Sequence, residues 1–331
     1  MTYRVMAVIA LLGSASTVHA GAIDRTGQPI TALFESGRYA EFSLGSVSPD
    51  ISGVGVQATP GAQSGNMTDS FLSFGAAYKA DLTDQISYAI IYDQPFGADV
   101  AYPTGTGYFG PRPGITAPGA PYSVKGDRET GVGYVAGVAF EKPEIALRVS
   151  LTYNSKIKYD VNTTENSAIG RNVRSSTHVE TPQSLNLEFQ TGIAADTLLF
   201  GGVRWTDWSS FEIAPAQYSA LTGGSKLLSY NDDIYTYSLG VGRRITETWS
   251  VAASVAYEKQ VGGYASNLGP SDGQRSMALA ATYTRNNMKI TTGIRYVNIG
   301  DAQTRAAAAA PAARFADNDA IAIGVKVGFN F

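Results

Sequence analysis

Residues Ala320 to Phe331 read AIAIGVKVGFNF, and this stretch decides the fold class of the chain. Apolar residues occupy every odd position, whereas small or polar residues occupy every even position. A side-chain period of two is typical of a β-strand, because successive side chains point to opposite faces. Twelve residues suffice to cross a bilayer, which takes about 9 to 11 residues of a tilted strand. The stretch therefore predicts a membrane-spanning strand; the alternative is the edge strand of a soluble sandwich.

The first twenty residues have the pattern of a secretory signal peptide. Arg4 is followed by an apolar segment from Val5 to Leu12, and Val18-His19-Ala20 has the form of a cleavage site. We therefore expect residues 1–20 to be removed and the mature chain to lie outside the cytoplasm. No later segment approaches the roughly 20 apolar residues of a spanning helix, and the mean hydropathy is −0.07. A mature chain in a membrane must then be a closed barrel.

Composition excludes several classes of function. Without residues 1–20 the chain has 24 Lys and Arg against 28 Asp and Glu, a net charge of −4, which argues against a nucleic-acid partner. The absence of cysteine excludes disulfides, thiol catalysis and cysteine-based metal sites. No histidine cluster or phosphate-binding loop is present, so no metal or cofactor is predicted. The 19 tyrosines and 36 glycines are typical of a barrel with aromatic girdles and tight turns, although a secreted β-sandwich array is the alternative.

Alternating patterns predict an all-β, antiparallel transmembrane barrel of about twelve strands, an even number as in bacterial single-chain barrels. The expected strands cover 38–47, 69–80, 85–93, 130–140, 145–161, 184–193, 197–211, 234–245, 248–259, 275–283, 288–297 and the final stretch. Long polar loops, such as 162–177, alternate with short turns. Residues 21–37 show no alternation, and we interpret them as a plug inside a barrel formed by residues 38–331.

The third expected strand ends in a segment that favours a break in the barrel wall. Proline cannot donate to a strand ladder, and glycine permits a bend. The five residues of this candidate lateral opening are Asp93, Gln94, Pro95, Phe96 and Gly97. A simple strand end is the alternative interpretation.

Several motifs together resemble one known family. Residues Trp205 to Phe211 read WTDWSSF, and Asn231-Asp232-Asp233 precede a glycine-containing strand that leads to a turn and Trp249. With the break after Tyr92, these motifs resemble the outer-membrane long-chain fatty acid transporter family, the FadL type of hydrophobic-compound channels. Phe331 also resembles the terminal aromatic residue of outer-membrane barrels. The chain departs from the family in its short plug, which lacks an Asn-Pro-Ala signature, and in missing about one hairpin, so that twelve strands stand against the family's fourteen.

The resemblance implies passive uptake of hydrophobic molecules across the bacterial outer membrane, above all of long-chain fatty acids. It implies lateral release through the kinked third strand, without enzymatic activity. The implied partners are the hydrophobic ligand, outer-membrane lipid and lipopolysaccharide, and the barrel-assembly machinery that reads Phe331. The resemblance also implies a monomer.

Candidate ligand contacts come from the loops, the plug and the lumen side of the strands. Tyr108 and Phe109 of the long external loop are candidates for first contact, although exposed aromatic residues also serve as interface anchors. Phe34 and Phe96 are the apolar candidates within the barrel. A lumenal cation would bind a carboxylate ligand, and alternation places these basic residues there: Arg148, Lys156, Lys158, Arg204, Arg244, Arg295 and Lys326. An ion pair with a lumenal acid such as Glu188 or Glu258 is the alternative for each.

Two other functions compete with this one. A general diffusion porin would agree with small lumenal residues such as Ser150 and Ser238, but it does not explain the break after Tyr92 or the apolar plug residues. A barrel hydrolase needs a serine activated by a base. His178, beside Ser175 and Ser176, is the only histidine after residue 20, and a lone loop histidine is more often simply solvated.

Overall fold

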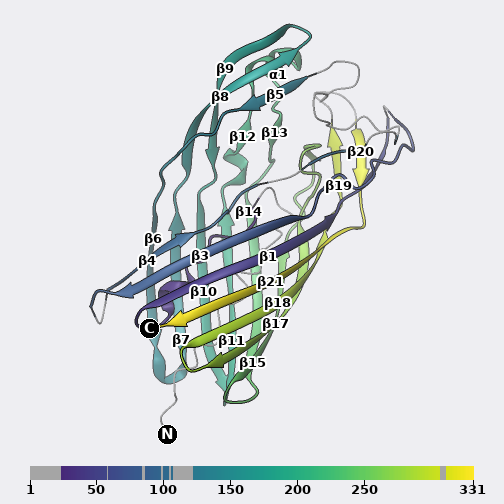
Figure 1. Ribbon diagram of the computed structural model, residues 1–331. Helices are drawn as coiled ribbons and strands as arrows, with labels where there is room; N and C mark the ends of the chain where they lie inside the picture. Colours follow the sequence, from purple (N-terminus) through teal and green to yellow (C-terminus); the bar gives the residue numbers. More distant parts are fainter. Residues whose placement is uncertain are drawn as a thin grey trace.

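The computed structural model describes residues 24–57, 59–83, 86–97, 100–103, 106, 122–305 and 311–331. The predicted signal peptide and the loop residues Tyr108 and Phe109 lie outside these residues. Twelve antiparallel strands form one large curved sheet (Figure 1). In order across the sheet they are β4 (Ser87–Tyr92), β3 (Phe71–Asp81), β1 (Tyr39–Asp50), β21 (Asn318–Asn330), β18 (Met288–Ile299), β17 (Gln274–Arg285), β15 (Trp249–Glu258), β14 (Ile234–Arg244), β11 (Thr197–Thr206), β10 (Ser184–Ala194), β7 (Leu147–Asn154) and β6 (Val135–Lys142).

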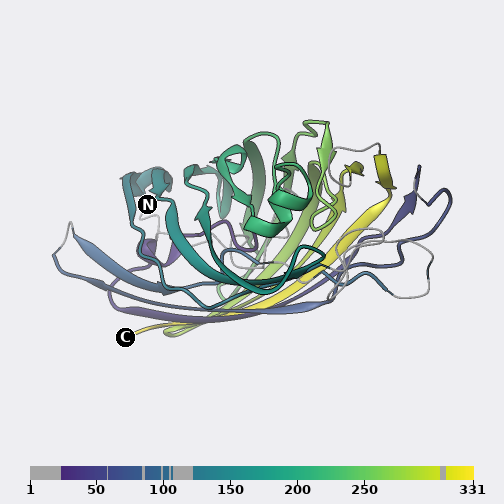
Figure 2. The ribbon, with the colours of Figure 1, turned by 90° about the horizontal axis from the view of Figure 1, so that it is seen from above.

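The all-β antiparallel fold is confirmed, but the closed barrel and the strand count are corrected. Strands β4 and β6 are the two edges of the main sheet and do not pair with each other in the described residues, so the sheet curves without closing (Figure 2). The described residues form 21 strands rather than twelve. Each of the twelve predicted ranges corresponds to a strand of the main sheet; the others are short or lie outside it.

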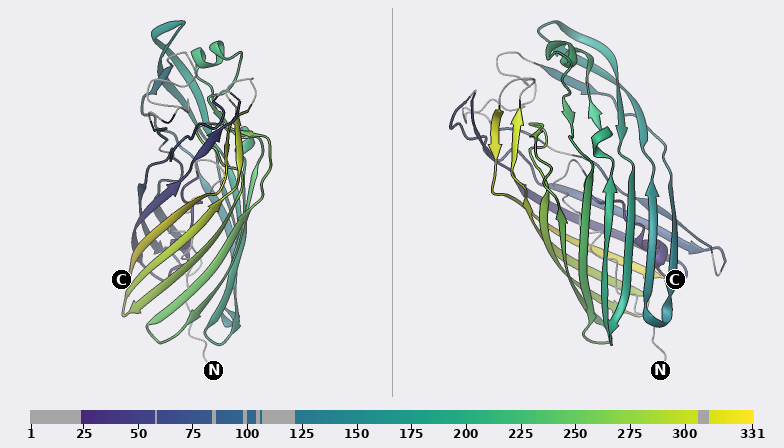
Figure 3. Two further views of the ribbon diagram at one scale, coloured as in Figure 1. Left: turned by 90° about the vertical axis from the view of Figure 1, so that its right-hand side faces the viewer. Right: turned by 180° about the vertical axis from the view of Figure 1, so that it is seen from behind.

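The remaining strands form three small sheets beyond one end of the main sheet (Figure 3). They are β2 (Gly53–Gly55), β5 (Ser123–Gly126), β8 (Ile157–Ser167), β9 (Gly170–Thr181), β12 (Glu212–Ile213), β13 (Leu228–Ser229), β16 (Tyr264–Ala265), β19 (Ala302–Arg305) and β20 (Pro311–Phe315). The helical segments are η1 (Thr31–Phe34), η2 (Pro143–Ile145), η3 (Trp208–Ser210) and α1 (Ala216–Leu221). None of the helices in the described residues is long and apolar enough to cross a membrane.

Residues 145–161, predicted as one strand, form two. Strand β7 ends at Asn154, and β8 begins at Ile157 and pairs with β9, so the predicted loop 162–177 is part of a long hairpin. Figure 1 shows this hairpin standing beyond the main sheet. The sequence pattern missed the hairpin beyond Val161 because a hairpin outside the lipid needs no continuous apolar face, and residues 162–167 (NTTENS) are polar on both faces.

The main sheet has an apolar outer face and a polar inner face. On β21 the side chains of Ile321, Ile323 and Val325 are exposed, whereas Ala320 and Ala322 are buried. Exposed apolar rows of this extent are not found on a protein that lies in water, but lipid covers them in a barrel wall. The predicted final strand is therefore present with the predicted sidedness.

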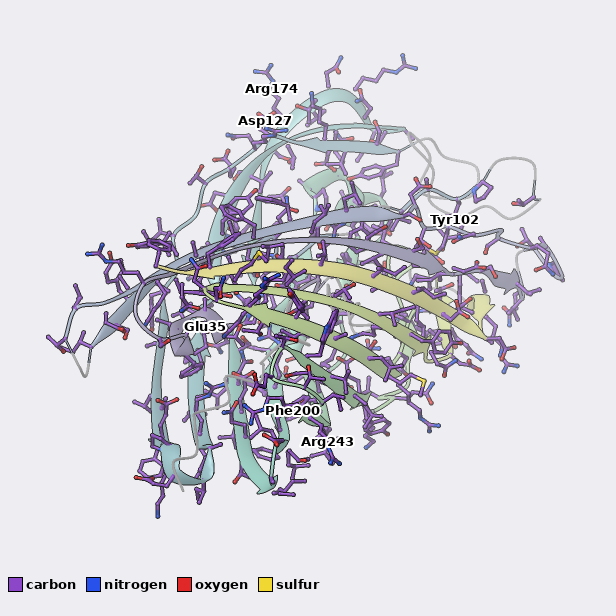
Figure 4. All side chains as sticks on the ribbon, turned by 60° about the horizontal axis from the view of Figure 1, so that its bottom comes forward. Glu35, Tyr102, Asp127, Arg174, Phe200 and Arg243 are labelled. Carbon is purple, nitrogen blue, oxygen red and sulfur yellow. The ribbon has the colours of Figure 1, made fainter. Side chains whose placement is uncertain are left out.

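The N-terminal segment, residues 24–37, lies against the inner face of the sheet. Its short helix η1 contacts β1, β3 and β4, and Ala32 is buried with Tyr39 and Ala77. Lys79 Nζ donates to the carbonyl oxygens of Glu35 at 2.7 Å and Gly37 at 3.1 Å. Figure 4 shows Glu35 beside η1, far from Arg174 and Asp127 at the outer end of the molecule.

Candidate functional site

A cavity of about 180 Å³ lies between the N-terminal segment and the inner face of the sheet. Side chains from η1 and from strands β7, β10, β11, β14, β15 and β18 surround it. Its aromatic and charged lining residues are Phe34, Arg148, Glu188, Phe200, Arg204 and Arg295. Phe34, Arg148 and Arg204, three residues predicted from sequence as ligand contacts, are thus brought together.

Phe34 and Arg148 form one unit within this cavity. The Arg148 guanidinium lies 3.9 Å from the centre of the Phe34 ring, a cation–π contact. Arg148 Nη2 also donates to Gln190 Oε1 at 2.9 Å, and its Nη1 lies 3.8 Å from Glu141 Oε1. Arg148 therefore holds the aromatic side of the N-terminal segment against β7 and β10.

Arg204 holds the other side of the same segment. Its Nη2 donates to Asp24 Oδ2 at 3.0 Å, and its Nη1 donates to the Gly27 carbonyl oxygen at 3.0 Å. The same Nη1 reaches Ser184 and Asn186 on β10. Both Arg204 and Asp24 are almost fully buried, so their ion pair is shielded from water. Arg204 is therefore an anchor of the N-terminal segment rather than a free cation awaiting a carboxylate.

Two further inward-facing cations are paired with acids, as the alternative interpretation anticipated. Lys326 Nζ lies 3.1 Å from Glu41 Oε2. Arg295 is buried within electrostatic range of buried Glu258, whose Oε1 accepts a hydrogen bond from Thr236 at 2.6 Å. These acids neutralise the positive charges of Lys326 and Arg295.

The structure places the remaining basic candidates away from the cavity. Lys156 Nζ and Lys158 Nζ lie 2.7 and 3.1 Å from oxygens of Glu180 on β9, outside the main sheet. Arg244 pairs with Asp196, which lies in the turn between β10 and β11. Lys156 and Arg244 therefore do not line the main cavity with Arg148, because the chain leaves the sheet after Asn154 and Arg244 lies at the turn end of β14. Their role as ligand contacts stays a prediction.

The segment Asp93–Gly97 leaves the sheet where β4 ends, at Tyr92. It turns to the N-terminal segment: Thr26 Oγ1 donates to Asp93 Oδ2 at 2.6 Å. Arg25 N donates to the Pro95 carbonyl oxygen at 2.7 Å, and Arg25 Nε donates to that of Gly97 at 2.9 Å. Strand β4 pairs with β3 only from Ala76 to Asp81, so in the described residues the β3–β4 ladder covers only the second half of β3.

Sequence reasoning missed an aromatic cluster that contacts this segment. Trp208 is buried, with its ring centre 5.8 Å from that of Phe96 and 5.0 Å from that of Tyr230. Trp205 Nε1 donates to Asp233 Oδ2 at 2.9 Å, and Ser209 Oγ donates to the other oxygen of that carboxylate at 2.6 Å. The WTDWSSF motif could have indicated the cluster, because it contains both tryptophans, but only the fold brings Phe96 to them.

His178 does not form a nucleophile–base pair. Its Nδ1 lies 2.9 Å from Asp160 Oδ1 and its Nε2 lies 3.2 Å from Glu180 Oε1, so carboxylates occupy both ring nitrogens. Ser175 Oγ instead donates to Glu165 at 3.1 Å. In the described part of the chain, no group of three or more His, Cys, Asp or Glu residues is placed to hold a metal ion.

We expect His178 to titrate above the ordinary histidine value. Hydrogen bonds with Asp160 first, and then with Glu180, raise its pKa. Because the folded pKa is raised, the imidazolium stabilises the β8–β9 hairpin at pH values below about 6.5, and this contribution is lost as the pH rises through the folded pKa. The NMR titration of the His178 imidazole should have a midpoint above about 6.5, and Asp160→Asn should lower it. A wild-type midpoint at or below the ordinary value would contradict the hairpin geometry.

The described geometry defines a class of protein: a membrane-spanning β-sheet protein with an apolar outer face and a partly aromatic internal cavity. The sequence model of the family described as outer membrane protein transport protein (OMPP1/FadL/TodX) matches residues 110–331. The chain belongs to this family. It is therefore a bacterial outer-membrane transport protein and not an enzyme, and both predictions are confirmed.

Three solved structures resemble the chain in fold. A Pseudomonas aeruginosa FadL homologue has a TM-score of 0.76 at 13% sequence identity, covering 96% of this chain and 97% of that one. The Pseudomonas putida toluene transporter TodX has a TM-score of 0.59 at 13% identity, covering 91% of each chain. The Ralstonia pickettii toluene transporter TbuX has a TM-score of 0.53 at 12% identity, covering 96% and 98%. No curated protein matches the chain significantly.

Proposed function

We propose that this outer-membrane transport protein is a passive channel for hydrophobic molecules that leave sideways into the membrane. The observation that carries the proposal is the cavity, closed on one side by the N-terminal segment, within a sheet whose edges β4 and β6 do not pair in the described part of the chain. An apolar solute gains about 25 cal/mol for each Å² that it removes from water. A partly aromatic cavity supplies such surface without any chemical step.

The volume of the cavity limits the size of the ligand that fits within it. An apolar cavity of about 150 Å³ is large enough to bind benzene, and the cavity here has a volume of about 180 Å³. A single-ring molecule therefore fits within it. A long-chain fatty acid, which the sequence favours, would have to extend beyond it toward the open edge of the sheet. The toluene named for TodX and TbuX is a suitable first probe alongside oleate.

The route that we propose passes the N-terminal segment, which acts as the plug. A second, smaller cavity of about 40 Å³ lies on its other side, lined by Ser43, Gly75 and Asp93 among others. Thr26 and Pro29 line both cavities, so they form the partition between them. Movement of this partition would join the main cavity to the smaller one, beside the end of the β3–β4 ladder at Ala76 and Tyr92, where a ligand can enter the lipid.

The test is uptake of oleate and toluene by an outer-membrane strain that lacks its own transporters. Wild-type protein should restore uptake of at least one solute. A variant in which Asp93–Gly97 is rebuilt as regular strand should fold and reach the membrane but lose uptake. Uptake of small sugars without either apolar solute would overturn the proposal and favour the general porin. Contact with lipopolysaccharide, recognition of Phe331 by the assembly machinery and a monomeric state stay predictions.

A further inference from the structure

Glu188 is the one acid of β10 that faces the main cavity, and its surroundings differ from those of its neighbours. Along the inner face of this strand, Asn186 Oδ1 accepts a hydrogen bond from Arg204 at 2.8 Å and Gln190 Oε1 accepts one from Arg148 at 2.9 Å. Glu188 lies between them, yet within the described residues it makes no hydrogen bond or ion pair. Glu188 is half-buried, and a carboxylate in this position needs a hydrogen-bond donor from water or from a ligand when the protein supplies none.

Space lies directly in front of Glu188. Its two partners across the sheet are Ser150 on β7 and Gly202 on β11, and the side chain lies over Gly202: a Cβ built there would be 3.5 Å from Glu188 Cγ. The row continues with Ser238 on β14 and Ala256 on β15, and all of these residues line the cavity. A row of small residues therefore leaves the carboxylate facing open space rather than a protein donor.

Aromatic and cationic side chains lie on the other walls of the cavity, among neutral residues such as Thr236 and Val255. Phe34 closes it from the N-terminal segment, and Phe200 faces inward from β11 two residues before Gly202. Arg148 and Arg204 attract the Glu188 carboxylate electrostatically, but their hydrogen bonds go to other groups. The cavity thus combines ring-sized apolar contact with the Glu188 carboxylate, an acceptor to which the described residues donate no hydrogen bond.

We propose that Glu188 is a specificity-determining residue that accepts a hydrogen bond from the hydroxyl group of a neutral single-ring ligand, so that the channel favours phenols over plain hydrocarbons. This inference rests on the proposed function and narrows its ligand class. A carboxylate has an acceptor whether or not it is protonated. A ligand that carries a carboxylate, by contrast, would approach the two arginines beside Glu188. Repulsion between the two carboxylates disfavours binding of such a ligand.

The experiment measures binding of toluene, p-cresol and p-toluate to the purified full-length protein in detergent by calorimetry. p-Cresol is toluene with one hydroxyl group added, and p-toluate carries a carboxylate instead. The measured quantity is the ratio of the affinity for p-cresol to the affinity for toluene. The two ligands differ in the free energy of removal from water, but this difference is the same for every variant and cancels when the ratios are compared. Glu188→Leu removes the acceptor, and Glu188→Gln keeps a neutral acceptor. Glu144→Leu, at an exposed turn residue, is the matched control.

We expect the ratio to fall about tenfold in Glu188→Leu, the effect of losing one hydrogen bond to a charged acceptor. Toluene binding should persist in that variant, p-toluate binding should improve in Glu188→Gln, and Glu144→Leu should behave as wild type. An unchanged ratio in Glu188→Leu would overturn the inference. Absence of binding and uptake for every apolar probe would instead overturn the proposed function, so the two failures are distinguishable. Because Glu188→Leu removes a carboxylate without a hydrogen-bond partner, we expect it to fold.

Discussion

Arg204→Met should raise the conductance of the protein in planar bilayers above that of wild type. Arg204 holds residues 24–28 through Asp24, Gly27 and Gln28. Removing one partner of a buried ion pair costs about 3–5 kcal/mol, because the other charge is left uncompensated. Asp24 is 4% exposed, and it regains hydration only if the N-terminal segment leaves the sheet. We therefore expect the segment to detach and the main cavity to open to water.

The matched control is Arg244→Met. Arg244 also pairs with an aspartate, Asp196, but this pair is partly exposed at a turn, and exposed pairs contribute about 0–1 kcal/mol. Its conductance should equal that of wild type. Deletion of residues 21–36 should reproduce the Arg204→Met result. If neither the deletion nor Arg204→Met exceeds the wild-type conductance, the N-terminal segment is not a plug.

A disulfide between the N-terminal segment and the end of β4 should abolish uptake reversibly. Thr26 Oγ1 and Asp93 Oδ2 are 2.6 Å apart, so the two side chains meet, and the chain has no native cysteine to interfere. In Thr26→Cys with Asp93→Cys, oxidation fixes the partition that we propose must move. Transport of the apolar probe should fall to the level of a strain without the channel, and a reductant should restore it.

A second cysteine pair controls for the crosslink itself. Thr282 and Thr291 are directly opposite on β17 and β18, with their Oγ1 atoms 3.0 Å apart, so Thr282→Cys with Thr291→Cys joins two strands of the wall. Oxidation of this pair should leave uptake unchanged. If the oxidised Thr26–Asp93 variant transports as well as its reduced form, ligands do not leave past the N-terminal segment, and the lateral route is wrong.

Alternation along the chain was sufficient to locate the main sheet. In β21, Ile323 and Val325 face outward and Lys326 faces inward, as the period of two predicts. This is a local property, because lipid selects the apolar face of each strand independently of its partners. The same reasoning placed Arg148 and Arg204 on the inner face. The predicted strand 145–161 extended past the end of the sheet and included Lys156, because a strand can keep its alternation after it has left the membrane.

What each inward residue contacts was decided by the tertiary structure. Arg204 meets Asp24 across 180 positions of the chain, and Phe96 meets Trp208. Neither contact follows from a local pattern, because each contact depends on how the curved sheet brings distant parts of the chain together. Within the strands of the main sheet, the sequence by itself determined which residues face outward and which face inward. Only the packing of distant strands decided that, among the described residues, β4 and β6 do not pair with each other and Glu188 faces the cavity without a hydrogen bond or ion pair.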